Sequence, residues 1–191
     1  ITVEAGEHTR RGCPVSLQLP WAAREYPFVR LEDKATGKEV PAQITRTGRG
    51  AVLTWLVDGL KAGQTQKLVA TGLKTGDDAR PAVRVEDDKD AGRADIHINN
   101  RLFTSYHYAD TWARPFLHPV KGPFGVDMTR AWPVVDGVPG ETKDHPHHKS
   151  VWVAYGDCNG VDNWGEGEGH GWQRHRGFVR KESGDVFGEL T

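Results

Sequence analysis

The chain reads Val15-Ser16-Leu17-Gln18-Leu19 near its N-terminus, so that apolar and polar side chains alternate. Alternate residues of a strand lie on opposite faces of a sheet, and the pattern therefore predicts a half-buried β-strand. Similar short segments, separated by turn residues, follow at a spacing of roughly ten residues. They are residues 28–32, 40–45, 51–57 and 67–70. We expect residues 1–75 to form a small antiparallel β-sandwich.

Strand signals return in the second half of the chain. Residues 94–98 and 101–106 flank Asn99 and Asn100, and Asn tolerates the left-handed backbone that a two-residue type I′ hairpin requires. We expect residues 83–191 to form part of a larger β-sandwich with long loops. A polar segment rich in turn residues, at residues 76–82, is the predicted linker. The predicted fold class is all-β.

The composition excludes several classes of protein. The 23 Gly and 11 Pro argue against a helical bundle, and the seven Trp, six Phe and four Tyr supply too much apolar surface for a disordered chain. The 25 Lys and Arg are balanced by 26 Asp and Glu, without the basic excess that is typical of a nucleic-acid-binding protein. Apolar runs are the length of strands, so no membrane span is expected.

The two ends and the cysteines carry further expectations. The chain begins at Ile1, which fits removal of a signal peptide or simple trimming, and it ends in a strand-like segment that has no partner strand after it. We expect an exported protein, secreted or periplasmic, of which these residues are a part that stops short of the C-terminus. Spacing gives no geometric support for a disulfide between Cys13 and Cys158, and two buried thiols are the preferred interpretation.

Histidines are concentrated in the run Asp144-His145-Pro146-His147-His148. In an extended conformation, residues 145 and 147 would point to one side and residue 148 to the other. Imidazole suits proton transfer because its ordinary pKa of about 6.5 is near neutral pH. Asp144 is placed to orient one ring. An acid/base or ligand-binding loop is one interpretation, and a hydrogen-bonded clamp stiffened by Pro146 is the other.

Metal binding is a separate alternative. A transition metal would take nitrogen ligands from His145, His147 and one distant histidine (His118, His170 or His175), although the spacing matches no zinc pattern. Oxygen-bearing side chains at residues 157, 159, 162 and 163 superficially resemble a calcium loop, with spacing that departs from the EF-hand. We expect no cofactor, with Ca²⁺ or a transition metal as the alternative.

Indole rings gather in the same part of the chain as the histidines. Trp offers a flat apolar face, which the C–H face of a pyranose ring can cover, and nearby glycines let the backbone approach a ligand closely. Arg114 would hold a carboxylate or a hydroxyl of the sugar, although an ordinary buried ion pair is the alternative. The candidate catalytic residues are Asp144, His147, His148 and Glu166. The candidate binding residues are Trp112, Arg114, His118, Trp152, Asn159, Trp164 and Trp172.

Residues 112–120, 144–152 and 156–164 together resemble the PmoA-like domain family, a group of uncharacterised, often exported bacterial proteins. The resemblance spans residues 83–191, and the Asp-His-Pro-His-His run is its most specific part. It implies a large β-sandwich like those of sugar mutarotases and polysaccharide lyases, preceded by a small β-sandwich. It also implies a role beside sugar degradation, with His147 or His148 as the acid/base and Arg114 as the substrate clamp.

The expected function is that of a carbohydrate-active enzyme: a hydrolase, a lyase or an epimerase. A hydrolase would need two carboxyl groups at a suitable separation. A lyase or an epimerase would need a His or Tyr base near an acidified carbon. A non-catalytic glycan-binding or surface-assembly module is one alternative, and a metal-binding protein is another. The expected partner is a carbohydrate, not a nucleic acid.

Overall fold

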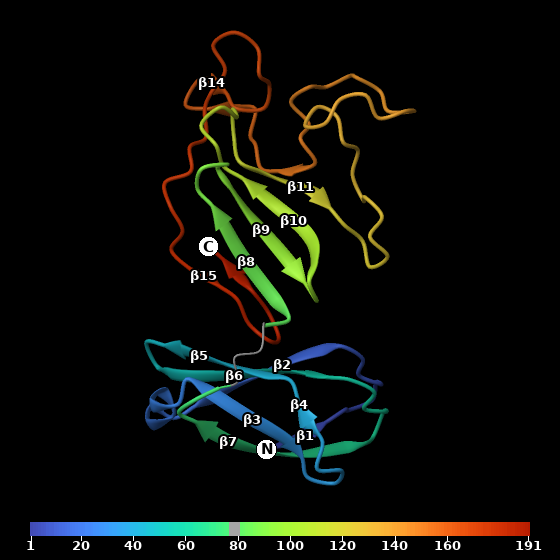
Figure 1. The fold of residues 1–191 in the computed structure, drawn as a ribbon, viewed down its shortest axis with the longest axis vertical. Coiled ribbons are helices and arrows are strands. Elements are labelled where there is room, and N and C mark those ends of the chain that lie inside the picture. Colours follow the sequence, from blue (N-terminus) through green and yellow to red (C-terminus); the bar gives the residue numbers. More distant parts are fainter. Residues whose placement is uncertain (77–80) are drawn as a thin grey trace. The chain divides into compact units, whose positions relative to one another are not determined.

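The computed structural model describes residues 1–76 and 81–191, and the chain divides into two compact units. Unit 1 comprises Ile1–Pro81 and Gly184–Phe187, and unit 2 comprises Ala82–Ser183 and Gly188–Thr191. Part of the expected linker, residues 77–80, lies outside the described residues. Both units are built from antiparallel sheets (Figure 1), which confirms the predicted all-β class.

Two antiparallel sheets form unit 1. The first has the strand order β1-β7-β3-β4, with the bounds Thr2–Glu4, Thr65–Leu73, Phe28–Asp33 and Glu39–Val40. The second has the order β2-β6-β5, with the bounds Cys13–Leu19, Gly50–Val57 and Ala42–Thr47. A short 3₁₀ helix, η1, spans Trp21–Glu25. Among the described residues, no helix has the length and hydrophobicity needed to cross a membrane.

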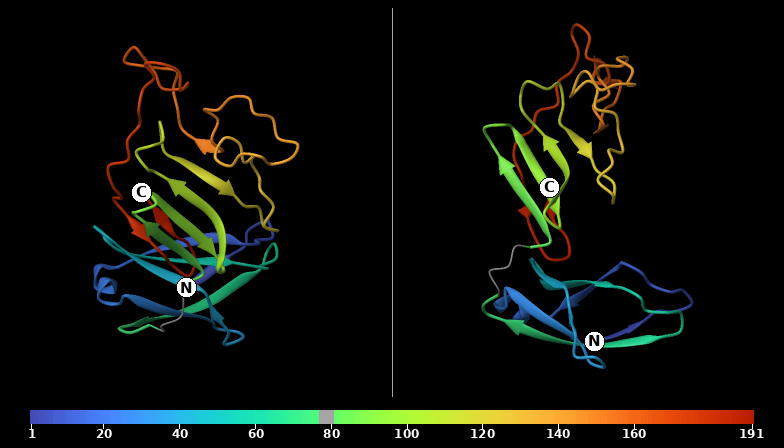
Figure 2. Two further views of the ribbon diagram at one scale, coloured as in Figure 1. Left: turned by 45° about the horizontal axis from the view of Figure 1, so that its top comes forward. Right: turned by 45° about the vertical axis from the view of Figure 1, so that its right-hand side comes forward.

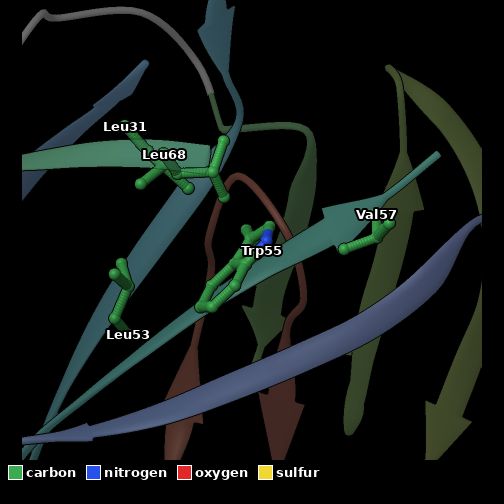
Figure 3. Close-up of a cluster of buried hydrophobic side chains, with 5 residues drawn as sticks. All are labelled: Leu31, Leu53, Trp55, Val57 and Leu68. Atoms are coloured by element: carbon green, nitrogen blue, oxygen red, sulfur yellow. The ribbon is translucent and has the colours of Figure 1, made fainter. Parts of the chain in front are cut away.

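Five buried side chains form the core of unit 1 (Figure 3). Leu31 on β3 and Leu68 on β7 come from the four-stranded sheet, and residues 53, 55 and 57 come from β6 in the other sheet. Because alternate residues of a strand share a face, Leu53, Trp55 and Val57 all reach the same side of β6. Burying each large apolar side chain contributes about 1.5–3 kcal/mol. The core therefore joins the two sheets as a sandwich.

A five-stranded antiparallel sheet forms the centre of unit 2. Its order is β12-β11-β10-β9-β8, with the bounds Val151–Trp152, Phe116–Val120, Arg101–His107, Arg93–Ile98 and Val83–Asp88. Ile98 pairs with Arg101 across the β9–β10 hairpin. The two residues between them, Asn99 and Asn100, have φ angles of 50° and 63°. The predicted hairpin is therefore confirmed, together with the left-handed backbone that Asn tolerates.

Long loops gather at one end of this sheet (Figures 1 and 2). Residues 121–150 connect β11 to β12, and residues 153–180 follow β12. Unit 2 also contains two short hairpins. They are β13 (Asp157–Cys158) with β14 (Val161–Asp162), and β15 (Lys181–Glu182) with β16 (Glu189–Leu190). Most of the predicted site residues lie on these loops, so loop packing decides which of them meet.

Both cysteines are free thiols, as expected. Their predicted burial is wrong. Cys13 is half-buried on β2, and Cys158 is exposed. Cys158 is exposed because it belongs to a two-stranded hairpin, β13–β14, in which every strand residue is exposed.

Candidate functional site

The histidine run forms a tight turn. Pro146 and His147 occupy its centre, and the backbone N–H of His148 donates to the carbonyl oxygen of His145 at 2.9 Å. Proline favours the first central position of a turn because its ring presets φ. The extended geometry considered for this run is therefore wrong. The turn brings all three imidazoles into mutual contact instead of separating His148 from the other two.

We define the imidazole–indole cluster as His145, His147, His148, Trp152 and Trp164. His145 and His148 are stacked with ring centroids 4.9 Å apart, and His147 lies edge-on to His148 at 4.4 Å. The two indoles approach to 4.9 Å, and His148 lies 5.6 Å from Trp152 and 5.8 Å from Trp164. Aromatic rings attract one another at such distances. The cluster therefore joins the histidine turn to β12 and to the loop at residue 164.

A cavity of about 500 Å³ opens beside the cluster. Its lining residues are His148, Ser150, Trp152, Val153, Ala154 and Trp164. About half of the Trp164 surface remains exposed, at 48%. A more apolar hollow of about 530 Å³ shares Trp152 and Val153 with this cavity. The cavity thus offers indole faces together with an imidazole and a hydroxyl, a combination of flat apolar and polar groups that is typical of a small-molecule site.

A buried ion network lies behind the cluster. Arg114, with 2% of its surface exposed, donates from Nη1 to Glu166 Oε1 at 3.1 Å and from Nη2 to the carbonyl oxygen of Gly165 at 2.9 Å. Lys149, with 4% exposed, contacts the same carboxylate oxygen. The Arg114 guanidinium also lies 5.0 Å from the Trp152 ring. Removing one partner of a buried ion pair costs about 3–5 kcal/mol, so the network anchors the loops that carry the cluster.

The environment of His147 and His148 favours the neutral form of both rings. Burial lowers the pKa of His147 and of His148, and neighbouring imidazoles lower both pKa values further. Glu166 opposes this effect at His147, and Asp144 opposes it at His148. With pKa values below the ordinary value of about 6.5, both rings are mostly neutral at pH 7. A neutral imidazole has a nitrogen that accepts a proton.

The Asp144 carboxylate contacts Arg130 and His145, and it does not contact the candidate acid/base residues His147 and His148 among the described residues. Its carboxylate accepts hydrogen bonds from Arg130 at 2.5 Å and Thr142 at 2.9 Å, and it lies 3.0 Å from His145 Nδ1. These contacts, led by Arg130, hold the pKa of Asp144 far below its ordinary range. The carboxylate therefore stays ionised near neutral pH, and the ring that it orients is His145.

The remaining candidates fall into two groups. Trp112 lies at the ion network, because Lys149 Nζ is 5.8 Å from its ring. His118, Asn159 and Trp172 lie elsewhere, and none has a ring contact with the imidazole–indole cluster among the described residues.

Each of these three residues has local surroundings of its own. His118 is buried on β11, 6.4 Å from the ring of His107. Asn159 is exposed at the turn between β13 and β14, and Trp172 packs on His170 at 4.6 Å and under Arg174 at 4.1 Å.

The two alternative metal sites that the sequence suggested have no ligand geometry among the described residues. Within residues 1–76 and 81–191, no group of three or more His, Cys, Asp or Glu side chains is placed to hold a metal ion. In the segment that superficially resembles a calcium loop, the carboxylates accept hydrogen bonds from the backbone. Asp157 accepts from the N–H of Gly160 at 2.8 Å, and Asp162 accepts from the N–H groups of Trp164 and Gly165. Their oxygens therefore stabilise turns of the loop.

Sequence reasoning missed Lys149 and Arg130. Lys149 stands directly after His148 in the quoted run, but a lysine is normally left in water. Its burial depends on Glu166, a partner 17 residues away. Arg130 contacts Asp144 across 14 residues of loop. Pairings at such separations, through irregular loops, leave no periodic signal in a single sequence.

Comparisons with known proteins give a family without an assigned activity. A family model described as a family of unknown function (DUF6807) matches residues 93–191, slightly more than half of the chain. Its description does not name a PmoA-like family. No curated protein and no solved structure matches the chain.

Proposed function

Starting from a chain that belongs to a family of unknown function (DUF6807), we propose a carbohydrate-active protein that binds a saccharide beside Trp152 and Trp164. His147 or His148 transfers the proton in the reaction. Among the reaction types, we favour a lyase or an epimerase acting on a glycan that contains a sugar with a carboxyl group. The basis is the site alone, since the family description supplies no reaction.

The observation that carries the proposal is the imidazole–indole cluster at the cavity. Trp152 and Trp164 lie 4.9 Å apart with an angle of 61° between their planes, so the cavity wall contains two indole faces in different orientations. His148 lines the same cavity. A pyranose ring placed on an indole face would have its carbon-bound hydrogens near an imidazole. Apolar faces and a few convergent polar groups are the usual composition of such sites.

The state of the acidic residues favours proton abstraction over hydrolysis. Hydrolysis of a glycosidic bond generally needs two carboxyl groups, one of them protonated. Glu166 instead contacts two cations, Arg114 and Lys149. Asp162 accepts backbone hydrogen bonds that lower its pKa. A neutral imidazole, by contrast, can accept the proton of the acidified carbon beside a carboxyl group. In an epimerase a proton then returns to the opposite face of that carbon. In a lyase the neighbouring C–O bond breaks as the double bond forms, and the leaving oxygen takes up a proton.

The experiment compares turnover by the wild type and by histidine variants. The chain is incubated in deuterated buffer with saccharides that contain a uronic acid and with neutral saccharides. NMR follows deuterium uptake at the carbon beside the carboxyl group, and ultraviolet absorbance follows formation of a double bond. We expect His147→Ala or His148→Ala to lower the rate at least 100-fold, the usual size of a general acid–base contribution. His170→Ala, outside the cluster, is the matched control.

The turnover and binding measurements have three outcomes that would argue against all or part of the proposal. Turnover that both histidine substitutions leave unchanged would remove these rings from the chemistry. Saccharide binding without deuterium uptake or double-bond formation would favour the non-catalytic glycan-binding module. Absence of binding to every acidic and neutral saccharide would contradict the proposal as a whole.

We also propose that the PmoA-like resemblance of residues 83–191 reflects a real relationship and that the protein is exported, as members of that group often are. The support is the Asp-His-Pro-His-His run, residues 144–148, which is the most specific part of the resemblance. Expression of the complete gene, followed by fractionation of the culture into medium, periplasm and cytoplasm, tests the export proposal. Recovery from the cytoplasm alone would contradict it.

A further inference from the structure

Lys149, which follows His147 and His148 in the chain, is buried, and it takes no part in the proposed proton transfer. Lys149 keeps 4% of its surface exposed, and its Nζ lies 3.3 Å from the carbonyl oxygen of Pro146. An ammonium group is strongly hydrated and is seldom buried unless a partner compensates it. The partner here is Glu166.

Glu166 joins three segments that are distant in sequence. Its Oε1 atom contacts Lys149 from the histidine turn and Arg114 from the segment before β11. Glu166 itself lies on the loop that follows β14. Arg114 also binds the backbone of Gly165, next to Glu166 in the chain. The carboxylate is therefore the common point at which the three segments meet.

The ends of this connection lie next to the residues of the cluster. Lys149 directly follows His148 in the chain, and Glu166 comes two residues after Trp164. The His147 ring is 6.4 Å from the Trp164 ring, and the His148 ring is 5.8 Å from it. The ion pair thus connects the histidine turn to the Trp164 loop, and His148 and Trp164 line the cavity.

We propose that Lys149 and Glu166 form a positioning pair that holds the imidazoles of His147 and His148 against Trp164. In this role Glu166 exchanges no proton with a substrate. The catalytic meaning of the assignment rests on the proposed function, whereas the placement of the rings can be tested without a substrate.

The pKa of His147 distinguishes a positioning role of Glu166 from a purely electrostatic one. The groups that act electrostatically on its ring include His145, His148, Arg114, Glu166 and Asp162, and the two carboxylates are the ones that favour its protonated form. If Glu166 supplied only charge, Glu166→Gln would lower the pKa of His147 further. If Glu166 positions the ring, the same substitution releases the ring into water. The pKa then rises toward the ordinary value of about 6.5.

The experiment is an NMR titration of the histidine rings in the full chain, from pH 5 to pH 8. We expect Glu166→Gln to raise the pKa of His147, and both Glu166→Gln and Lys149→Met to remove the ring-current shifts that Trp164 imposes on both imidazoles. Lys149→Arg, which keeps the charge, should retain most of the wild-type shifts. Lys143→Met is the matched control, because Lys143 is an exposed lysine of the same loop and pairs with Asp136.

Two results would overturn the positioning role. One is a fall in the pKa of His147 in Glu166→Gln, with the ring-current shifts unchanged. The other is a failure of Glu166→Gln to fold, judged by circular dichroism, because the pair would then support the whole unit and not the site. Saccharide binding is measured on the same samples. A wild type that binds no saccharide contradicts the proposed function, and the titration still decides the positioning role.

Discussion

Single side chains in unit 2 gain their chemical character from neighbours that are remote in sequence. His148 is an ordinary surface residue type, yet it packs on His145 and on two indoles. This contact desolvates its ring and lowers its pKa. Trp164 packs on the same rings and keeps part of its surface exposed at the cavity. The proposed chemistry therefore depends on the contacts between these rings. Substituting one ring at a time tests how much each contributes to binding or turnover.

Replacement of one indole should separate the cavity from the rest of the loop surface. We expect Trp164→Ala to weaken saccharide binding about tenfold, because an aromatic contact contributes up to about 1.5 kcal/mol. Trp172→Ala should leave the affinity unchanged, since Trp172 packs on His170 and Arg174. Isothermal titration calorimetry measures both dissociation constants. Equal losses in the two variants would contradict the placement of the binding site at the cavity.

The core of unit 1 supports a prediction about stability. Trp55 is 1% exposed and packs between the two sheets. We expect Trp55→Ala to lower the free energy of unfolding by about 3–5 kcal/mol, because it leaves a large cavity. Trp21→Ala, at a residue that is 61% exposed, serves as the control and should change it by less than about 0.5 kcal/mol. Urea unfolding followed by far-ultraviolet circular dichroism measures both changes.

At the scale of elements, regular strands were predictable and loops were not. The period-2 pattern at residues 15–19 lies within β2, and the Asn pair lies in the β9–β10 turn, because both signals act over a few residues. The histidine turn was not predictable, since a proline with its preset φ fits an extended segment as well as a turn. Composition also could not separate Trp164, which joins the cluster, from Trp172, which does not.

The β9–β10 hairpin allows a test of backbone strain. Asn100 has a φ of 63°, which costs most L-residues roughly 1–2 kcal/mol. We expect Asn100→Ala to be about 1 kcal/mol less stable than Asn100→Gly, because Gly adopts this conformation without a steric penalty and both variants lose the hydrogen bond that Asn100 Oδ1 accepts from Arg84. Hydrogen exchange of the β9 and β10 amides reports the change. An Ala variant as well protected as the Gly variant would contradict the assignment of strain.

At the scale of the whole molecule, the near-balance of charge conceals an uneven response to acid. The net charge is −1, so little long-range repulsion is expected at neutral pH. Four histidines, however, have lowered pKa values for which burial is the leading cause. They are His107, His118, His147 and His148. A folded chain that resists protonation at several histidines should lose stability before its carboxylates titrate.

The sign of this pH dependence follows from the histidine pKa values. A histidine whose pKa is lower in the folded chain binds a proton more readily when unfolded, so stability is retained above about pH 6.5 and decreases as the pH falls below it. We expect the melting temperature to decrease between pH 7 and pH 5, as measured by differential scanning calorimetry. His8→Asn, at an exposed residue, should leave the profile unchanged. A melting temperature that increases over this range would contradict the prediction.

Because the Lys149–Glu166 contact is largely shielded from solvent, the site should tolerate changes in salt concentration. Dissolved ions screen charges at the surface and weaken exposed pairs such as Asp136–Lys143, whereas they screen the Lys149–Glu166 pair less, because its side chains are only 5% and 23% exposed. The arrangement of rings at the cavity should therefore persist from dilute freshwater to seawater salinity. A salt titration that moved the Trp164 fluorescence would show that ions penetrate to the network.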